Sequence, residues 1–325
     1  MPDPKKNLSI FSFSKTQLQL LGSIALFFVP VIAIFLTVES LVIDLPSSFK
    51  KIGQRIEQKG DKVKVAVFGS SQIMQGINPE YFTQEALNLS SEAQHHNTDF
   101  NLLKGFTPRF DDLETVVFEV SYSHFEIPHN SKHYWKNSVF LKYYNVNTFD
   151  RPVYFKDKLV FPSHPAYFSD RLLEYHLKDS LPYRYNDFGY DTNLYRGKFK
   201  RLEYNVDSIQ ASKVRLSSRE GLEVLDYNAQ YFWQMIEYAA ANQWNIVIIS
   251  PPTFNNYNAV RNQAIVKRRD SILKEVAIKY PAIKFLNCEN DRSFKVSEFR
   301  NENHLNPLGA QRFTKKLDSV LRTFK

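Results

Sequence analysis

The hydrophobic pattern of the chain begins with one long uncharged stretch. From Thr16 to Val38 no residue carries a formal charge, and leucine, isoleucine, valine and phenylalanine dominate. A helix over this stretch, at about 1.5 Å of rise per residue, crosses the roughly 30 Å hydrocarbon core of a bilayer. Pro30 is tolerated there because local adjustments satisfy the freed carbonyl group. We predict a transmembrane helix over residues 16–38.

The charges on either side of this stretch predict its orientation. Lys5, Lys6 and Lys15 precede it, whereas Glu39 and Asp44 follow it. The positive-inside rule then places residues 1–15 in the cytoplasm and the rest of the chain outside it, in the periplasm or at the cell surface.

A cleaved signal peptide and a buried soluble helix are the alternatives to a membrane anchor. Secretory apolar regions run for about 7 to 15 residues and end at small residues, whereas this run is longer and Thr37-Val38-Glu39-Ser40 is a poor cleavage site. We therefore predict an uncleaved single-pass anchor, followed by a juxtamembrane helix or linker over residues 39–62.

Beyond residue 62, short β-branched runs alternate with longer helical patterns. The predicted strands are 63–68, 115–120, 245–250 and 283–286, and the predicted helices are 226–242, 257–279 and 307–323. This alternation predicts an α/β fold with a mostly parallel sheet covered on both faces. Ligands of such sheets bind beyond the carboxyl ends of the strands, so we look for site residues directly after strands.

The segment of about residues 122–225 interrupts the alternation. It is rich in tyrosine, phenylalanine, histidine, tryptophan and asparagine. We predict an insertion within a domain of residues 63–325 that forms a wall of the site. Its aromatic side chains suit core packing and, where exposed, stacking on sugar rings.

The composition narrows the class of protein. A hydrophobic fraction of 43% and a charged fraction of 23% suffice for a packed core and exclude general disorder. The single cysteine, Cys288, excludes an intramolecular disulfide and a cysteine-based zinc cluster. The net charge of +8 is spread along the chain, so we predict no nucleic-acid partner.

The sequence contains none of the common cofactor motifs. It has no phosphate-binding glycine-rich loop, dinucleotide fingerprint or zinc motif, so we predict no cofactor and no metal. The adjacent pair His95 and His96 lies in a polar stretch without a nearby acidic or cysteine cluster, which predicts a solvated surface pair.

A serine after the first predicted strand and a histidine before the last predicted helix are candidates for nucleophilic catalysis. Ser71 lies in the turn after the first strand, in Phe68-Gly69-Ser70-Ser71-Gln72, at the start of a predicted helix, where its backbone N–H is unpaired. A helix-capping serine is the alternative. His304 lies just before the helix that begins with Asn306 and Pro307. Over one sheet edge they form a candidate Ser/His pair.

These two stretches resemble a known family. Gly69-Ser70-Ser71 is similar to block I of SGNH/GDSL hydrolases, usually Gly-Asp-Ser, in the Gly-Ser-Ser variant of membrane-anchored relatives. The stretch Asn301-x-x-His304-Leu305-Asn306-x-x-Gly309-Ala310 resembles block V, usually Asp-x-x-His-Leu-Asn-x-x-Gly-Ala. The resemblance implies a flavodoxin-like three-layer α/β sandwich over most of residues 63–323.

The resemblance also implies roles for single residues. Ser71 matches the nucleophile, which also donates its backbone N–H to the oxyanion, and His304 matches the general base. Residues 88–93 stand where block II would, so the N–H near Ala93 is a predicted oxyanion donor. The block III asparagine is absent after the predicted strand 115–120, and Ser121, Ser123 or His124 is expected in its place.

Asn301 is the main departure from the family pattern. The usual aspartate orients the imidazole and stabilises its charged form, whereas Asn301 fixes the tautomer without adding charge. The corresponding Asp-to-Asn change costs about 10⁴ in rate in the serine-protease example, although Cys-His-Asn triads function on other folds. Glu302 and Asp291 are the other candidates for that charge.

The resemblance implies an extracytoplasmic serine esterase or O-acyltransferase that acts through an acyl-serine on a cell-surface or exported polysaccharide. Members with one N-terminal membrane helix, such as alginate O-acetylation and D-alanine transfer proteins, work beside a multi-pass membrane acyltransferase. The first alternative is a catalytically weak protein that binds polymer or scaffolds an export complex. The second alternative is an unrelated membrane-anchored protein in which Ser71 and His304 serve only as a helix cap and a core residue.

Overall fold

A parallel five-stranded sheet forms the centre of the computed structural model, which describes residues 14–178 and 182–324. The strand order is β2-β1-β3-β4-β5, which is the flavodoxin-like order. The strands are β1 (Val65–Phe68), β2 (Ala86–Asn88), β3 (Thr115–Glu119), β4 (Asn245–Ser250) and β5 (Lys284–Asn287). The chain order reverses between β1 and β3, so the polar residues that follow these two strands lie at the expected position of a ligand site.

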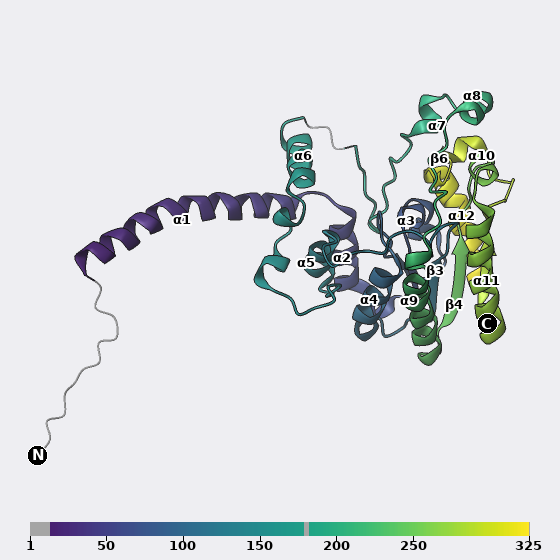
Figure 1. Cartoon of the computed structure of the whole chain (residues 1–325), viewed down its shortest axis with the longest axis horizontal. Helices are drawn as coiled ribbons and strands as arrows, with labels where there is room; N and C mark the ends of the chain where they lie inside the picture. Colours follow the sequence, from purple (N-terminus) through teal and green to yellow (C-terminus); the bar gives the residue numbers. More distant parts are fainter. Residues whose placement is uncertain (1–13, 179–181, 325) are drawn as a thin grey trace, which may run out of the picture.

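Helices cover both faces of the sheet, as the sequence pattern predicts. Val65 and Val67 face one helical layer, and Ala66 and Phe68 face the other. The first layer contains α3 (Ser71–Gly76) and α12 (Pro307–Leu321). The second contains α4 (His96–Phe106), α9 (Leu222–Ala241) and α11 (Gln263–Lys279), as Figure 1 shows. The predicted three-layer α/β architecture is confirmed.

Two details differ from the sequence prediction. Strand β2 (Ala86–Asn88) was not predicted, because three residues are too few to display an alternating pattern. The single helix predicted over 257–279 is divided into α10 (Asn255–Ala259) and α11. The break occurs because the Asn262 side chain accepts the N–H of Ala264 and caps a new helix.

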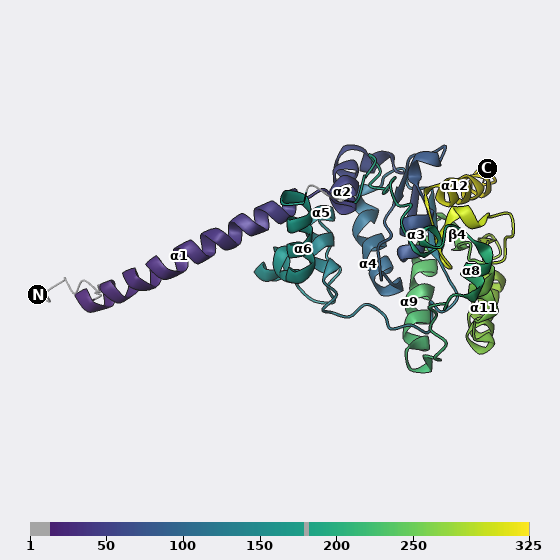
Figure 2. The same cartoon turned by 90° about the horizontal axis from the view of Figure 1, so that it is seen from above.

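The apolar N-terminal stretch forms α1 (Lys15–Asp44), which extends away from the domain (Figures 1 and 2). Ser14 and Gln17 form a capping box at its start. Its most apolar window has a mean hydropathy of 2.6, so the helix is long and apolar enough to cross a membrane. A signal sequence has the same properties. Lys5 and Lys6, whose charges predict the orientation of the helix, lie outside the described residues.

The last turns of α1 pack against the domain. The Glu39 carboxylate accepts the backbone N–H groups of Val160 and Phe161 at 2.7 and 2.8 Å. Val42 is buried beside Phe168 of α6 (Pro165–His176). The following α2 (Ser48–Lys59) packs on α5 (Lys136–Tyr144). Residues 39–62 are therefore mostly helical and joined to the domain.

The aromatic-rich segment 122–225 contains short helices that lie in two places (Figure 1). Helices α5 and α6 flank the end of α1, whereas α7 (Lys198–Arg201) and α8 (Val206–Ala211) lie on the other side of the domain. Phe140 and Tyr144 are fully buried, and Tyr154 and Phe155 are exposed. Some of its large aromatic side chains thus serve as core, and several others line a cavity beside α3.

Candidate active site

Strand β1 ends in a tight turn that presents Ser71. A Cβ atom on Gly69, which has φ +155°, would lie 2.6 Å from the Glu119 carboxylate, so only glycine fits there. Ser70 is the N-cap of α3, and its side chain accepts the N–H of Gln72 at 3.3 Å. Ser71 is therefore the first residue of the helix, at the carboxyl end of β1.

A small antiparallel hairpin positions the histidine. Strands β6 (Phe299–Asn301) and β7 (His304–Leu305) pair, and Asn301 lies opposite His304 across the turn. Helix α12 begins two residues after Leu305, and the Asn306 side chain caps it by accepting the N–H groups of Leu308 and Gly309. The block V residues thus build a hairpin and a helix start that aim His304 at α3.

Ser71, His304 and Asn301 form a continuous hydrogen-bonded chain. Ser71 Oγ lies 2.9 Å from His304 Nε2, and His304 Nδ1 lies 3.0 Å from Asn301 Oδ1. Asn301 Oδ1 also accepts the backbone N–H groups of Asn303 and His304, which identifies it as the carbonyl oxygen. His304 Nδ1 therefore carries the proton, and the Nε2 lone pair accepts from the Ser71 hydroxyl.

The surroundings of His304 favour its neutral form. Burial, followed by the positive charge of Arg300, lowers the pKa of His304 to about 4. The imidazole is therefore unprotonated at neutral pH and available as a base. The imidazolium that forms when it takes a proton receives no carboxylate charge from Asn301.

The two other candidate carboxylates point elsewhere. Glu302 forms an ion pair with Lys198, and Asp291 lies 2.5 Å from Lys316 Nζ. Lys316 lowers the pKa of Asp291 to about 2. Both acids are thus paired with lysines, and Asn301 is the side chain that contacts His304 Nδ1.

The N–H of Ser71 is well placed to bind an oxyanion. Ser70 N–H is held by Glu119, whereas no acceptor for Ser71 N–H occurs within the described part of the chain. The loop after β2 runs alongside, because Ser91 N–H donates to Gly69 O at 3.2 Å. Ser90 precedes Ser91 in this loop. Its hydroxyl is buried and has no hydrogen-bond partner among the described residues.

Ala93 and Ser121 lie near this region without a direct contact to the pair. Ala93 adopts a left-handed conformation with φ 54°, and its carbonyl accepts a hydrogen bond from Asn130. Ser121 Oγ is 3.5 Å from His124 Nδ1. Neither is hydrogen bonded to Ser71 or His304 among the described residues, and their oxyanion roles stay predictions.

The structure adds Glu119, which the sequence reasoning missed. Glu119 is fully buried at the end of β3, and its carboxylate accepts both the N–H and the hydroxyl of Ser70. Burial raises the pKa of Glu119, and its hydrogen bonds to Ser70 partly oppose this shift. An acidic residue inside the apolar run Thr-Val-Val-Phe-Glu-Val was the signal in the sequence.

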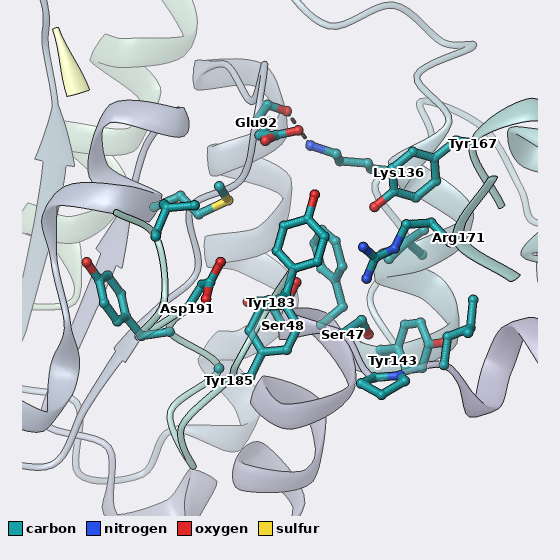
Figure 3. Close-up of a pocket in the computed structure, with 18 of the residues that line it drawn as sticks. Ser47, Ser48, Glu92, Lys136, Tyr143, Tyr167, Arg171, Tyr183, Tyr185 and Asp191 are labelled. Atoms are coloured by element: carbon teal, nitrogen blue, oxygen red, sulfur yellow. Dashed lines mark hydrogen bonds between the residues drawn. The ribbon is translucent and has the colours of Figure 1, made fainter. Parts of the chain in front are cut away.

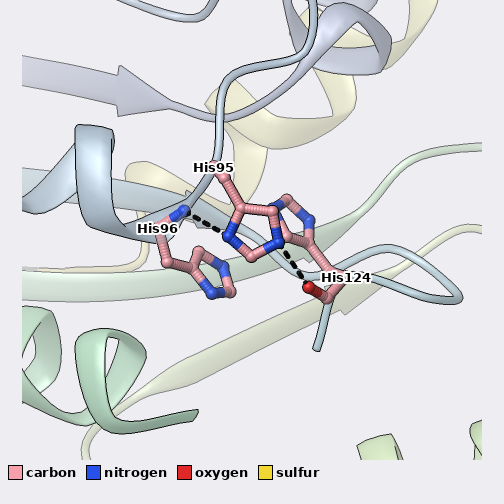
Figure 4. Close-up of side chains that lie close together, drawn as sticks. All are labelled: His95, His96 and His124. Atoms are coloured by element: carbon pink, nitrogen blue, oxygen red, sulfur yellow. Dashed lines mark hydrogen bonds between the residues drawn. The ribbon is translucent and has the colours of Figure 1, made fainter. Parts of the chain in front are cut away.

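His95 and His96 are buried, so the predicted solvated surface pair is wrong. Their rings pack with His124 beneath the sheet edge (Figure 4), because α4 begins at His96 and directs this end of the helix inward. Burial lowers the pKa of all three imidazoles, that of His96 to about 4.

The geometry of this cluster indicates packing. The ligand nitrogens of His95, His96 and His124 lie within 4.8 Å of one another. Both nitrogens of His95 are already hydrogen bonded, one to His96 N–H and one to His124 O. The rings of His96 and His124 stack at 4.2 Å with an interplanar angle of 3°, so their lone pairs lie in parallel planes and do not converge on one ion.

Comparisons with known proteins give distant structural likenesses and no match in sequence. No family model and no curated protein matches the sequence. A solved structure from Streptococcus pneumonia, provisionally described as a platelet activating factor, has 11% sequence identity and a TM-score of 0.40. The match covers 90% of this chain and 99% of that chain. At this level the likeness carries no information on activity, so the function rests on the site geometry.

Proposed function

We propose that this chain is a membrane-anchored serine esterase or O-acyltransferase of the SGNH type. The observation that carries the proposal is the 2.9 Å approach of Ser71 Oγ to His304 Nε2 between segments 233 residues apart. Asn301 holds the tautomer in which Nε2 is free to accept the proton. A helix cap does not require this contact.

The reaction proceeds in two steps, acylation of Ser71 and then deacylation. His304 Nε2 takes the Ser71 proton as Oγ attacks an ester or thioester carbonyl carbon, and the resulting oxyanion binds the Ser71 N–H. Collapse breaks the bond to the leaving group, which receives that proton and leaves acyl-Ser71. Water or a hydroxyl group then attacks the acyl carbon, gives its proton to His304 and restores the Ser71 hydroxyl.

The cellular setting is part of the proposal. The lysines before the apolar stretch 16–38 and the acids after it support a cytoplasmic tail and an extracytoplasmic domain. The resemblance of blocks I and V to anchored SGNH proteins supports an exported or cell-surface polysaccharide as the acylated or deacylated polymer. It also supports a multi-pass membrane acyltransferase as partner.

Turnover of an aryl acetate by the full-length protein in detergent tests the proposal. The whole chain is required because Glu39 and Val42 of α1 pack on the domain. Ser71→Ala and His304→Ala should each lower turnover by at least about 10³, as for other serine triads. The matched controls Ser319→Ala and His133→Ala alter exposed side chains and should leave turnover unchanged.

Two outcomes contradict this function. Turnover that survives both substitutions places the reaction elsewhere on the protein. Absence of both turnover and a phosphonyl adduct on Ser71, which mass spectrometry would detect after Oγ displaces fluoride from a fluorophosphonate, favours the weakly catalytic or scaffolding alternative. Asn301 is the feature that favours that alternative, because it adds no charge beside His304.

A further inference from the structure

A cavity of about 220 Å³ opens beside the serine. Met74 and Gln75 line it and follow Ser71 by three and four residues, so all three share one face of α3. Arg300, the residue before Asn301, lines it too and donates to Gln75 Oε1 at 2.7 Å. Whatever fills this cavity lies within one helical turn of the proposed nucleophile.

The opposite wall of the cavity belongs to the end of the membrane helix. Val42, Leu45 and Pro46 line it together with Val139 and Phe168. Val42 follows Val38, the last residue of the predicted span, by one helical turn, or roughly 6 Å along the axis. The cavity therefore extends from the expected membrane surface to α3, the helix that begins at Ser71, and its membrane side is apolar.

The middle of the cavity is positively charged. Lys136, Arg171, Arg196 and Arg300 line it, against the acids Glu92 and Asp191 among the described residues. Figure 3 shows Arg171 and Lys136 entering from α6 and α5 on one side, with Glu92 and Asp191 across from them. Lys136 Nζ binds the Glu92 main-chain carbonyl, and the carboxylates that pair with Arg171 and Arg196 lie 3.5 and 4.0 Å away, at Glu174 and Asp191.

Arg171 is the side chain that most strongly indicates an anion site. It is only 6% exposed, and its Nη1 atom makes no hydrogen bond within the described residues. The closest ion-pair partner, Glu174, is 3.5 Å away, and the guanidinium lies 4.2 Å from the centre of the Tyr183 ring. Burying an arginine with an unpaired N–H donor costs folding free energy unless an anion accepts a hydrogen bond from that donor.

The other cations show the same lack of neutralising charge. Burial, followed by repulsion from Arg196, lowers the pKa of Arg300. Burial lowers the pKa of Lys136 to about 8. A bound anion would relieve both effects, because an opposite charge favours the protonated form.

We propose that this cavity binds a membrane lipid with an anionic, phosphate-bearing headgroup. The phosphate lies against Arg171 and Arg300, which present planar donors suited to phosphate oxygens. The lipid chains leave past Val42 and Phe168 along α1 into the bilayer. The lipid is the carrier of the reacting ester or of the accepting hydroxyl, a part that rests on the proposed function.

The surface around the cavity suits a lipid more than a soluble ligand. Leu173 and Leu177 of the α6 region are 46% and 77% exposed, and Phe155 is 78% exposed. These side chains lie in the segment that flanks α1 and would be expected at a bilayer interface. A free anion requires no apolar wall, and a neutral sugar requires no buried arginine.

Trp135 lines the cavity and reports its occupancy. The full-length protein in maltoside detergent is titrated with dihexanoyl-phosphatidylglycerol while tryptophan fluorescence is followed. We expect a saturable change that Trp135→Phe abolishes. Dihexanoyl-phosphatidylcholine, whose choline cation cancels the phosphate charge, and inorganic phosphate, which has no acyl chains, should each bind at least about tenfold more weakly.

Substitutions locate the anion site. Arg171→Gln should weaken binding of the anionic lipid about tenfold, whereas Arg215→Gln, at an exposed position outside the cavity, should not change it. Arg196→Gln, with a side chain 39% exposed, serves as a second variant in case Arg171→Gln loosens α6, and circular dichroism checks that each variant is folded.

Three results would overturn the lipid site: no saturable response, equal binding of the choline lipid or of phosphate alone, or unchanged binding in both folded arginine variants. Ser71→Ala should bind the lipid as the wild type does, which separates binding from chemistry. Serine-dependent aryl-ester turnover without lipid binding removes only the lipid site. Lipid binding without turnover removes only the proposed function.

Discussion

The carboxylate of Glu119 lies directly beneath Ser70 and accepts both its backbone N–H, at 2.5 Å, and its hydroxyl, at 3.0 Å. These bonds join the end of β3 to the turn that follows β1. Ser71 is the next residue, so the acid fixes the position of the proposed nucleophile without touching it. Glu119 is therefore a positioning residue.

Removing this acid should destabilise the fold and displace Ser71. Glu119→Ala leaves two buried Ser70 donors without acceptors, at a cost of roughly 2 to 5 kcal/mol, and Glu119→Gln should cost less because one acceptor remains. Thermal unfolding measures the loss, with Glu114→Gln, at the exposed residue just before β3, as control. Equal midpoints for Glu119→Ala and wild type would contradict this role.

The pH dependence of this effect has a defined sign. Burial raises the pKa of Glu119, so the folded state is favoured by protonation and loses stability as the pH rises through that value. Glutamine does not titrate. The stability advantage of wild type over Glu119→Gln should therefore shrink from pH 4.5 to pH 8. A constant difference over this range would show that the pKa of this carboxyl is the same in the folded and the unfolded protein, which would contradict the shift.

Asn301→Asp should make His304 a stronger general base. A carboxylate 3 Å from His304 Nδ1 stabilises the imidazolium, so kcat/KM for an aryl acetate should rise at least about tenfold at pH 7.5. The acid limb of the pH profile, expected near the His304 pKa of about 4, should move upward by roughly one to two units.

Asn303→Asp is the matched control for this change. It adds the same charge in the same turn, from a side chain that makes no hydrogen bond to His304 in the structure. Its acid limb should move less than that of Asn301→Asp. Equal profiles for both variants would mean that the effect is a general one of charge, and that Asn301 does not orient the imidazole.

The buried histidines should make the protein acid-sensitive. Burial lowers the pKa of His95, His96 and His124, whereas the unfolded imidazoles take up protons below about pH 6.5. Stability should therefore fall as the pH drops from about 6.5 toward 4, by at most roughly 1.4 kcal/mol per pH unit for each imidazole.

Thermal unfolding at a series of pH values measures this slope. His124→Gln removes one titrating group and should make the slope shallower, whatever its effect on absolute stability. His133→Gln changes an exposed histidine and should preserve the wild-type slope. Parallel slopes for wild type and His124→Gln would indicate that His124 is already protonated in the folded state.

Glu39 should control how firmly α1 is attached to the domain. Its carboxylate accepts the N–H groups of Val160 and Phe161, so Glu39→Ala leaves both donors unpaired. Hydrogen exchange of residues 155–165 should then be faster by about tenfold or more, which corresponds to a local loss of about 1 to 3 kcal/mol. Glu57→Ala, exposed on α2, should leave this exchange unchanged.

The pattern of buried strands was readable from the sequence because it depends on local composition. The β-branched runs before Gly69 and Val120, and the run at 245–250, each form a strand of the sheet. Strand β2 escaped because it is short, and its pairing with β1 depends on the long-range fold. The Asn262 cap that divides the helix predicted over 257–279 is a local signal that the longer helical pattern concealed.

The histidine pair shows where local reasoning fails. His95 and His96 stand among polar residues, yet the ring of His96 stacks on His124 from a different loop and the ring of His95 meets His124 edge-on. Glu119 is the converse case, an acid in an apolar strand whose partner, Ser70, comes from the neighbouring strand end. In both cases, burial and pairing depend on residues far away along the chain.

The sequence by itself determined the apolar N-terminal helix, the α/β class and the identity of Ser71, His304 and Asn301 as candidates, because each depends on short-range pattern or spacing. Only the tertiary structure decided that the serine and the imidazole meet, that Glu119 supports the turn and that a cationic cavity is lined both by the end of α1 and by the helix that begins at Ser71. Those relationships arise when parallel strands bring their carboxyl ends to one edge, and no local pattern encodes which side chains meet there.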